Sequence, residues 1–238
     1  NALKLINQNR QTLKLDPINL DDLPLDDSKT YQLLQKGLTT AVFQLESRGI
    51  KEYIVKLKPN NFEDIITLIA LYRPGPLEMN MVETYIERKH GREEFSYGDE
   101  SVEKILDKTH GVIVYQEQVM QLAQEFSGFT LGEADILRRA MGKKIASEME
   151  EQKEPFITGA IEKGKNKRFA EGLFDQIEKF AGYGFNRSHS AAYAFISYQT
   201  AWLKAHYPAE FMSAVLSSEM DDTDTVSYTH LTLPTTYH

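Results

Sequence analysis

The chain has 238 residues, of which 41% are hydrophobic, 26% are charged and none is cysteine. This length suits one large globular domain or two small ones, and the lack of cysteine excludes a disulfide scaffold and a thiolate metal site. The formal net charge is -8, whereas a small free-standing DNA-binding domain is usually basic, so any anion site must come from a local group of basic side chains. No apolar run is long enough to span a membrane, and no signal-peptide pattern is present.

Apolar periodicity, cap residues, glycines and prolines predict a mainly α-helical fold with a few short β-strands. The acidic segment Asp16–Asp27 carries two prolines and is predicted to be an extended connector. Helices are expected at residues 1–10, 28–35, 48–57, 62–72, 81–90, 99–110, 115–126, 131–141, 147–163, 166–180 and 208–220, and in the stretch that ends at Tyr207. Short strands are expected at Thr40–Leu45 and Val112–Val114.

Four local signals make this prediction specific. Asp27 or Ser28, Asn61 with Asp64, and Thr130 with Glu133 are cap patterns at three helix starts. Pro155 should kink or split the helix at 147–163. The segment Arg73–Pro76, which reads RPGP, is expected to be a rigid loop. The helices at 62–71 and 193–203 are apolar enough to contribute to the core.

The segment 186–189, which reads NRSH, precedes the long helix that ends at Tyr207. Ser188 or Ser190 is expected to accept the first free amide of this helix. Free amides, the helix dipole and nearby basic side chains suit an anion such as a phosphate. An ordinary helix start with solvated polar residues explains the same pattern equally well.

Five stretches together resemble a known family. They are TTAVFQLESRG at 39–49, ALYRPGPL at 70–77, VYQEQVMQLA at 114–123, LRRAMGKK at 137–144 and GYGFNRSHSAAYAFISYQTAWLKAHYPAEFM at 182–212. In this order they resemble the fingers domain of the bacterial replicative DNA polymerase III alpha subunit. The resemblance covers roughly residues 21–224, and the missing initial Met suggests a fragment.

The resemblance implies a domain division. Residues 1–27 would connect to a preceding palm domain, residues 28–220 would form the multi-helix fingers domain, and residues 221–238 would be a tail. The Thr-rich segment 225–238 does not resemble the family's continuation, and we expect it not to be native.

The densest basic cluster is Arg138, Arg139, Lys143 and Lys144. Cations at a helix C-terminus complement the helix dipole, which is the simplest explanation. The resemblance implies instead that Arg138 and Arg139 lie beside the triphosphate of the incoming dNTP, with Lys143 as a further contact. Because adjacent helical residues point to different sides, one arginine is expected to support the structure while the other meets the ligand.

Other candidates for the nucleotide site come from three further motifs. The resemblance places His189 near the sugar or the phosphates, where its ring would disfavour a 2′-hydroxyl. Ser47 and Arg48 lie at a predicted strand-to-helix turn, where a plain serine cap is the alternative. Arg73 either reaches a phosphate or braces the RPGP loop, and Asn186 either binds nucleotide or holds its own loop.

A looser basic run consists of Lys163, Lys165, Lys167 and Arg168. A solvated helix edge is the simplest explanation, and contact with the DNA backbone is the alternative.

Polymerase chemistry needs two metal ions held by carboxylates. The resembled family holds Mg²⁺ with palm-domain aspartates, and no such motif occurs here, so we expect no metal site in this fragment and no activity of the fragment alone. The resemblance implies a cytoplasmic DNA-directed DNA polymerase as the parent, with dNTP, primer–template DNA and other replicative subunits as partners. A helical protein-interaction module and an independent nucleotide-binding enzyme are the alternatives.

Overall fold

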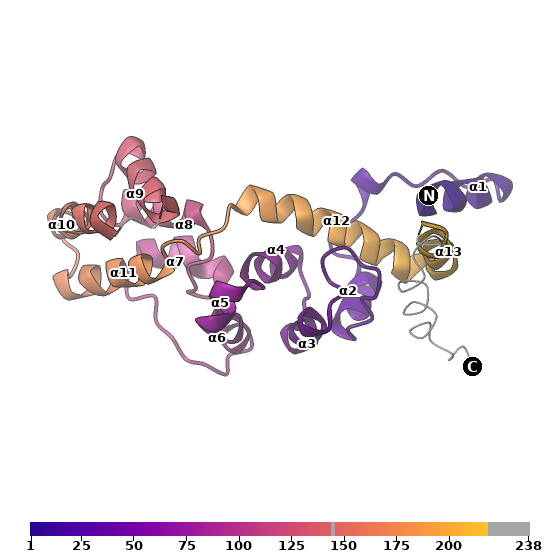
Figure 1. The fold of residues 1–238 in the computed structure, drawn as a ribbon, viewed down its shortest axis with the longest axis horizontal. Helices are drawn as coiled ribbons and strands as arrows, with labels where there is room; N and C mark the ends of the chain where they lie inside the picture. The colour runs from indigo at the N-terminus through magenta and orange to yellow at the C-terminus, as the bar shows by residue number, and fades with distance from the viewer. Residues whose placement is uncertain (144–145, 219–238) are drawn as a thin grey trace. The chain divides into compact units, whose positions relative to one another are not determined.

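The computed structural model describes residues 1–143 and 146–218, and these residues are mainly α-helical (Figure 1). They form two compact units. Among these residues, unit 1 contains 1–65 and 193–218, and unit 2 falls within Ile66–Ala192. The division falls inside two helices, α4 (Phe62–Leu71) and α12 (Arg187–His206).

Unit 1 is built from helices near both ends of the described chain. They are α1 (Ala2–Thr12), the 3₁₀ turn η1 (Leu20–Asp22), α2 (Ser28–Gln35), α3 (Arg48–Leu57) and α13 (Pro208–Ser218). α1 packs against α13, and α2 packs against α3. Ile6, Leu203 and Phe211 form one buried apolar cluster, so the first helix belongs to the core of this unit.

The start of α2 confirms the predicted cap at Asp27. Its Oδ2 accepts hydrogen bonds from the Thr30 amide at 2.8 Å and the Thr30 hydroxyl at 2.6 Å. The same oxygen lies 2.9 Å from Nε2 of His206, at the end of α12. One carboxylate therefore joins two helices of unit 1 that are far apart in sequence.

Unit 2 contains most of the remaining helices. They are α5 (Pro74–Glu78), α6 (Met81–Lys89), α7 (Glu100–Leu106) with the 3₁₀ turn η2 (Asp107–Thr109), α8 (Gln116–Glu125), α9 (Leu131–Lys143), α10 (Ala146–Glu162) and α11 (Lys167–Phe180). From α7 to α11, consecutive helices along the chain pack against each other. Between them, the rings of Phe126, Phe156 and Phe174 are buried in one apolar cluster.

Several sequence predictions are confirmed. The Asn61 side chain accepts from the Asp64 amide at 3.0 Å, and Thr130 and Glu133 exchange side-chain-to-backbone hydrogen bonds. The helical segments at 62–71 and 193–203 contribute buried side chains, among them Ile65 and Tyr198.

Three predictions are corrected. Thr40–Leu45 forms turns and not a strand, because Ala41 and Gln44 have φ values of 63° and 61°, which an extended strand does not allow. Val112–Val114 forms no strand, and the next residue, Tyr115, makes an isolated parallel bridge to Phe185. The RPGP segment opens the short helix α5, since a proline is well suited to the first position of a helix.

The helix α10 differs from the prediction made for Pro155. α10 runs unbroken through Pro155, so the proline does not split it. None of the described helices is both long enough and apolar enough to cross a bilayer.

Candidate nucleotide site

The first turn of α12 is capped by Asn186. Its Oδ1 accepts a hydrogen bond from the His189 amide at 2.8 Å. This corrects the predicted cap by Ser188 or Ser190: the buried Ser190 hydroxyl instead donates to the carbonyl of Ile66 at 2.6 Å. The side chain directly before the helix reaches the third amide, as N-cap residues do.

A carboxylate from α8 also occupies this helix start. Glu117 accepts from the Asn186 side-chain amide at 3.0 Å and from the Arg187 backbone amide at 3.1 Å. An acidic side chain is stabilising beside the positive end of a helix dipole. Glu117 therefore takes the place that the sequence alone suggested for a phosphate, and the sequence analysis did not identify it.

Arg73 holds the turn that leads into α12. Its Nε donates to the carbonyl of Ala70 and its Nη2 donates to the carbonyl of Tyr183, both at 2.7 Å. Its guanidinium also lies 4.4 Å from the ring centroid of Phe185, and burial lowers its pKa. These contacts are those of a brace, while a phosphate contact by Arg73 stays a prediction.

The end of α9 lies against the same turn. A methyl group at Gly184 would lie 2.9 Å from Cγ of Gln116 and 3.5 Å from Cε of Met141. Gln116 also donates from its side chain to the Gly184 carbonyl at 3.2 Å. The LRRAMGKK helix and the NRSHSA turn, about 40 residues apart in sequence, thus adjoin within unit 2.

Arg138 and Arg139 converge on one carboxylate, that of Asp135. One Asp135 oxygen accepts from Nε and Nη2 of Arg138 at 2.9 and 2.8 Å, and the other lies 2.8 Å from Nε of Arg139. The hydrogen bond from Arg138, with the charges of both arginines, lowers the pKa of Asp135. The expectation that the two arginines point to different sides is therefore wrong.

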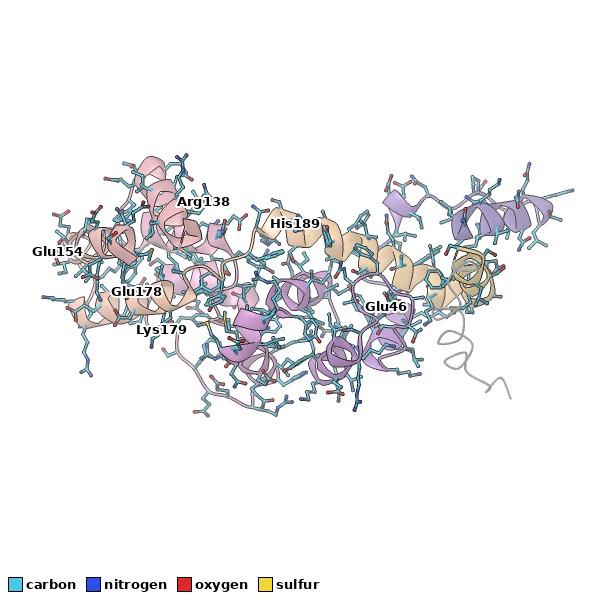
Figure 2. All side chains as sticks on the ribbon, viewed as in Figure 1. Glu46, Arg138, Glu154, Glu178, Lys179 and His189 are labelled. Atoms are coloured by element: carbon cyan, nitrogen blue, oxygen red, sulfur yellow. The ribbon has the colours of Figure 1, made fainter. Side chains whose placement is uncertain are left out.

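Both arginines remain accessible to a ligand. The Arg138 side chain is 35% exposed and that of Arg139 is 67% exposed. His189 is also exposed, and the edge of its ring meets the ring of Phe185 at a centroid distance of 5.6 Å. Figure 2 shows Arg138 on α9 and His189 in the first turn of α12. Lys144 and the side chain of Lys143 lie outside the described residues.

Comparison with known proteins decides the family. Residues 1–164 match the family model of the bacterial DNA polymerase III alpha subunit finger domain. The chain belongs to this finger-domain family. It is 57% identical to the DNA polymerase III subunit alpha of Escherichia coli strain K12, 58% to that of Pasteurella multocida strain Pm70 and 56% to that of Pseudomonas aeruginosa. Each alignment covers 94% of this chain and 20% of the relative, so the chain spans about one fifth of the length of these proteins.

Ser47 and Arg48 belong to unit 1 of this finger domain and open α3. Ser47 is the N-cap residue, but its side chain makes no cap hydrogen bond, so the plain serine cap is not what the structure has. The Arg48 side chain is 96% exposed and lies 3.3 Å from Glu52, one helical turn further on. Their nucleotide contact stays a prediction.

The basic run at 163–168 serves two different purposes in the structure. Lys163 donates to the carbonyls of Gln124 and Glu125, at 3.1 and 2.7 Å, and so caps the end of α8. Lys165 donates to both oxygens of Asp99, at 2.9 and 2.7 Å. These two lysines hold unit 2 together, which leaves less of their charge available to DNA.

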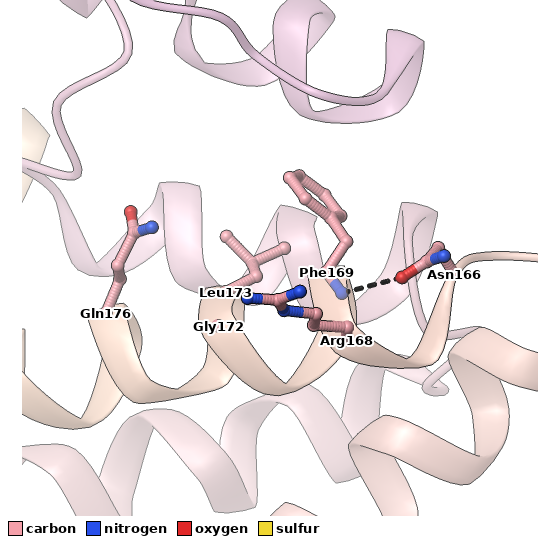
Figure 3. A pocket seen from close by; sticks show the side chains of 6 residues that line it. All are labelled: Asn166, Arg168, Phe169, Gly172, Leu173 and Gln176. Carbon is pink, nitrogen blue, oxygen red and sulfur yellow. Dashed lines mark hydrogen bonds between the residues drawn. The ribbon is translucent and has the colours of Figure 1, made fainter.

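Lys167 and Arg168 lie in the first turn of α11. Lys167 is 3.9 Å from Glu171 on an exposed face. Arg168 lines a shallow depression of about 350 Å³ together with Phe169, Leu173 and Gln176 (Figure 3). DNA contact by these residues stays a prediction. Among the residues 1–143 and 146–218, no three His, Asp or Glu side chains gather as a metal site would require.

Proposed function

We propose that this finger domain binds the triphosphate of an incoming dNTP through Arg138 and Arg139, in a DNA-directed DNA polymerase that extends a primer. The observation that carries the proposal is the approach of Met141 to Gly184, because it joins the arginine helix α9 to the turn before His189. Guanidinium groups are permanently charged and make forked contacts with phosphate oxygens.

Asp135 supports this role by holding the two arginines ready. Asp135 contacts Nε and Nη2 of Arg138 and Nε of Arg139, and the other N–H groups of the two partly exposed guanidinium groups would bind the phosphate oxygens. Two cations and one anion leave a local charge of +1, which favours an anion on an otherwise acidic chain. A pair already fixed by a carboxylate loses less side-chain entropy when the phosphate binds.

His189 contributes at the sugar. It is exposed at the helix start, and its position is fixed through the Asn186 cap. A ring beside the sugar would exclude a 2′-hydroxyl by steric contact. The relatives are named as DNA polymerase subunits, which agrees with a preference for deoxynucleotides.

The parent protein would supply the rest of the reaction. We propose that palm carboxylates outside this chain hold Mg²⁺. The partners of the parent protein would be primer–template DNA and other replicative subunits, and the parent protein would act in the cytoplasm. Domain limits at residues 27 and 220 belong to the same proposal. A protein-interaction module would not need two accessible arginines on a helix that adjoins the turn before an exposed histidine.

The test uses the complete polymerase that contains this domain. Arg138→Ala and Arg139→Ala should each lower kcat/KM for dNTP by about 10- to 100-fold, as expected for the loss of one charged hydrogen bond of about 1.5–3 kcal/mol. Affinity for primer–template DNA should change little. His189→Ala should mainly raise ribonucleotide incorporation.

Arg92→Ala is a matched control. Arg92 is an exposed arginine of unit 2 that pairs with one carboxylate, that of Glu87, through Nε at 2.7 Å. It should leave all three measurements unchanged. Arginine variants that keep their nucleotide dependence, or that lose DNA and nucleotide affinity equally, would contradict the proposed site.

A further inference from the structure

A basic groove lies on unit 1, between the end of α2 and the outer face of α3. It has a volume of about 650 Å³ and is lined by four cationic side chains and one carboxylate. The cations are Lys36, Arg48, Lys51 and Lys56, the carboxylate is Glu52, and Gly37 and Val55 complete the lining. A local charge of +3 on a chain with a net charge of -8 marks this groove as an anion site.

The inner wall of the groove has further positive charge behind it. Lys51 donates to the Thr40 hydroxyl at 2.8 Å, and Lys204 donates to the Thr40 carbonyl at 2.6 Å. Burial, and next the charge of Lys51, lower the pKa of Lys204 to about 8. Lys51 and Lys204 both donate to Thr40, so their positive charges repel each other, and an anion in the groove would reduce that repulsion.

The shape of the groove selects the kind of anion. Arg48, Lys51 and Lys56 follow one another along α3, and the eight steps from Arg48 to Lys56 rise about 12 Å along the helix. Phosphates recur regularly along one DNA strand, so cations spread over such a length can each meet a different phosphate. A compact triphosphate would instead need cations that converge on one point.

We propose that this groove binds the sugar–phosphate backbone of DNA and that Arg48 acts there as a backbone contact. The proposal rests on the proposed function, because a polymerase domain meets DNA as its partner. Val55, 42% exposed between the cations, offers an apolar surface to the sugars. The Ser47 hydroxyl, which makes no cap hydrogen bond, is available to a phosphate at the start of the row.

The test measures the salt dependence of DNA binding by this chain without any nucleotide. The probe is a fluorescein-labelled primer–template with a single-stranded overhang, followed by fluorescence anisotropy between about 50 and 200 mM salt. The groove variant carries Lys36→Gln, Arg48→Gln and Lys56→Gln, and leaves Lys51 in place because it holds Thr40. Losing three phosphate contacts should reduce the slope of log K against log salt by about 2 to 3.

The matched control carries Lys4→Gln, Lys14→Gln and Lys29→Gln, three exposed lysines of the same unit that do not line the groove. It removes the same net charge and should keep the slope of the unmodified chain. Glu52→Gln gives an independent test, because removing the only carboxylate in the lining should tighten DNA binding by about two- to fivefold. Misfolding cannot produce that gain.

Several outcomes would overturn the proposal. They are no salt-dependent binding by the unmodified chain, equal slopes for the groove variant and the control, weaker binding by Glu52→Gln, or displacement of the DNA by polyglutamate as readily as by unlabelled DNA. None of these measurements involves Arg138, Arg139 or a dNTP. Failure of the groove is therefore separate from failure of the nucleotide site.

Discussion

Replacing Arg73 by alanine should destabilise unit 2 and loosen the start of α12. The side chain is half-buried and joins three parts of the unit: the end of α4 at Ala70, the turn at Tyr183 and the ring of Phe185. Alanine keeps none of these contacts. The turn that precedes Asn186 would then be held mainly by its contacts with α8.

The magnitude follows from the contacts. Two hydrogen bonds to a charged donor contribute about 1.5–3 kcal/mol each, and a cation–π contact at a partly exposed site contributes about 0.5–1 kcal/mol. Water can reach part of this site and replace some of the donors, so we expect a net loss of about 2–3 kcal/mol, somewhat below the range of the summed contributions. For a chain of this size, that corresponds to a fall in Tm of about 5–10 °C.

The assay is urea and thermal unfolding followed by far-ultraviolet circular dichroism. Arg73→Lys should lose about half as much stability, because lysine keeps the charge but cannot donate to both carbonyls at once. Arg92→Ala, which removes an exposed arginine, should leave the transition unchanged. If Arg73→Ala unfolds at the same temperature and urea concentration as the unmodified chain, the bracing role is wrong and the phosphate contact becomes the better explanation.

Two further changes test the packing and the electrostatics. Gly159→Ala should lower Tm despite a gain in helix propensity of about 1 kcal/mol, because the new methyl would overlap the Ser127 carbonyl oxygen. An unchanged or higher Tm would contradict this close approach. Burial raises the pKa of Asp27, but the hydrogen bonds that its carboxylate accepts outweigh burial and lower the pKa below 3.8. The ionised carboxylate therefore stabilises the fold above pH 3.8, and this stabilisation is lost as the pH falls through the folded-state pKa. Asp27→Asn should therefore weaken the acid dependence of unfolding below about pH 4. Unfolding can be followed by the fluorescence of the single tryptophan, Trp202, which stacks on His206. Identical acid profiles for the variant and the unmodified chain would refute the argument.

The helices could be predicted because their signals are local. The caps at Asp27, Asn61 and Thr130 lie within three residues of the amides that they satisfy. The strand predicted at Thr40–Leu45 failed because apolar alternation does not reveal left-handed backbone angles at Ala41 and Gln44. The two prolines of RPGP did carry a signal for a helix start, and it was read as a loop.

In the candidate site, too, contacts between residues close in sequence were predictable, and contacts between distant residues were not. The spacing of Asp135 from Arg138 and Arg139, three and four residues, is a local signal for ion pairs on one helix face, and it could have been found. The role of Glu117 could not have been predicted from the sequence, because its partners Asn186 and Arg187 lie 69 and 70 residues away. Nothing in the local pattern around VYQEQVM indicates which helix start its carboxylate reaches.

This difference changes how an anion would be recognised beside α12. The sequence suggested free amides as the binding groups, but the Arg187 amide already donates to Glu117 and the His189 amide already donates to Asn186. A phosphate that used these amides would have to displace a carboxylate and break the cap of the helix. Side-chain cations on the adjoining α9 carry no such cost, because Asp135 occupies only one edge of each guanidinium. In the proposed function, recognition of the triphosphate would therefore fall to the side chains of Arg138 and Arg139 and not to these amides, while the start of α12 would fix the position of His189.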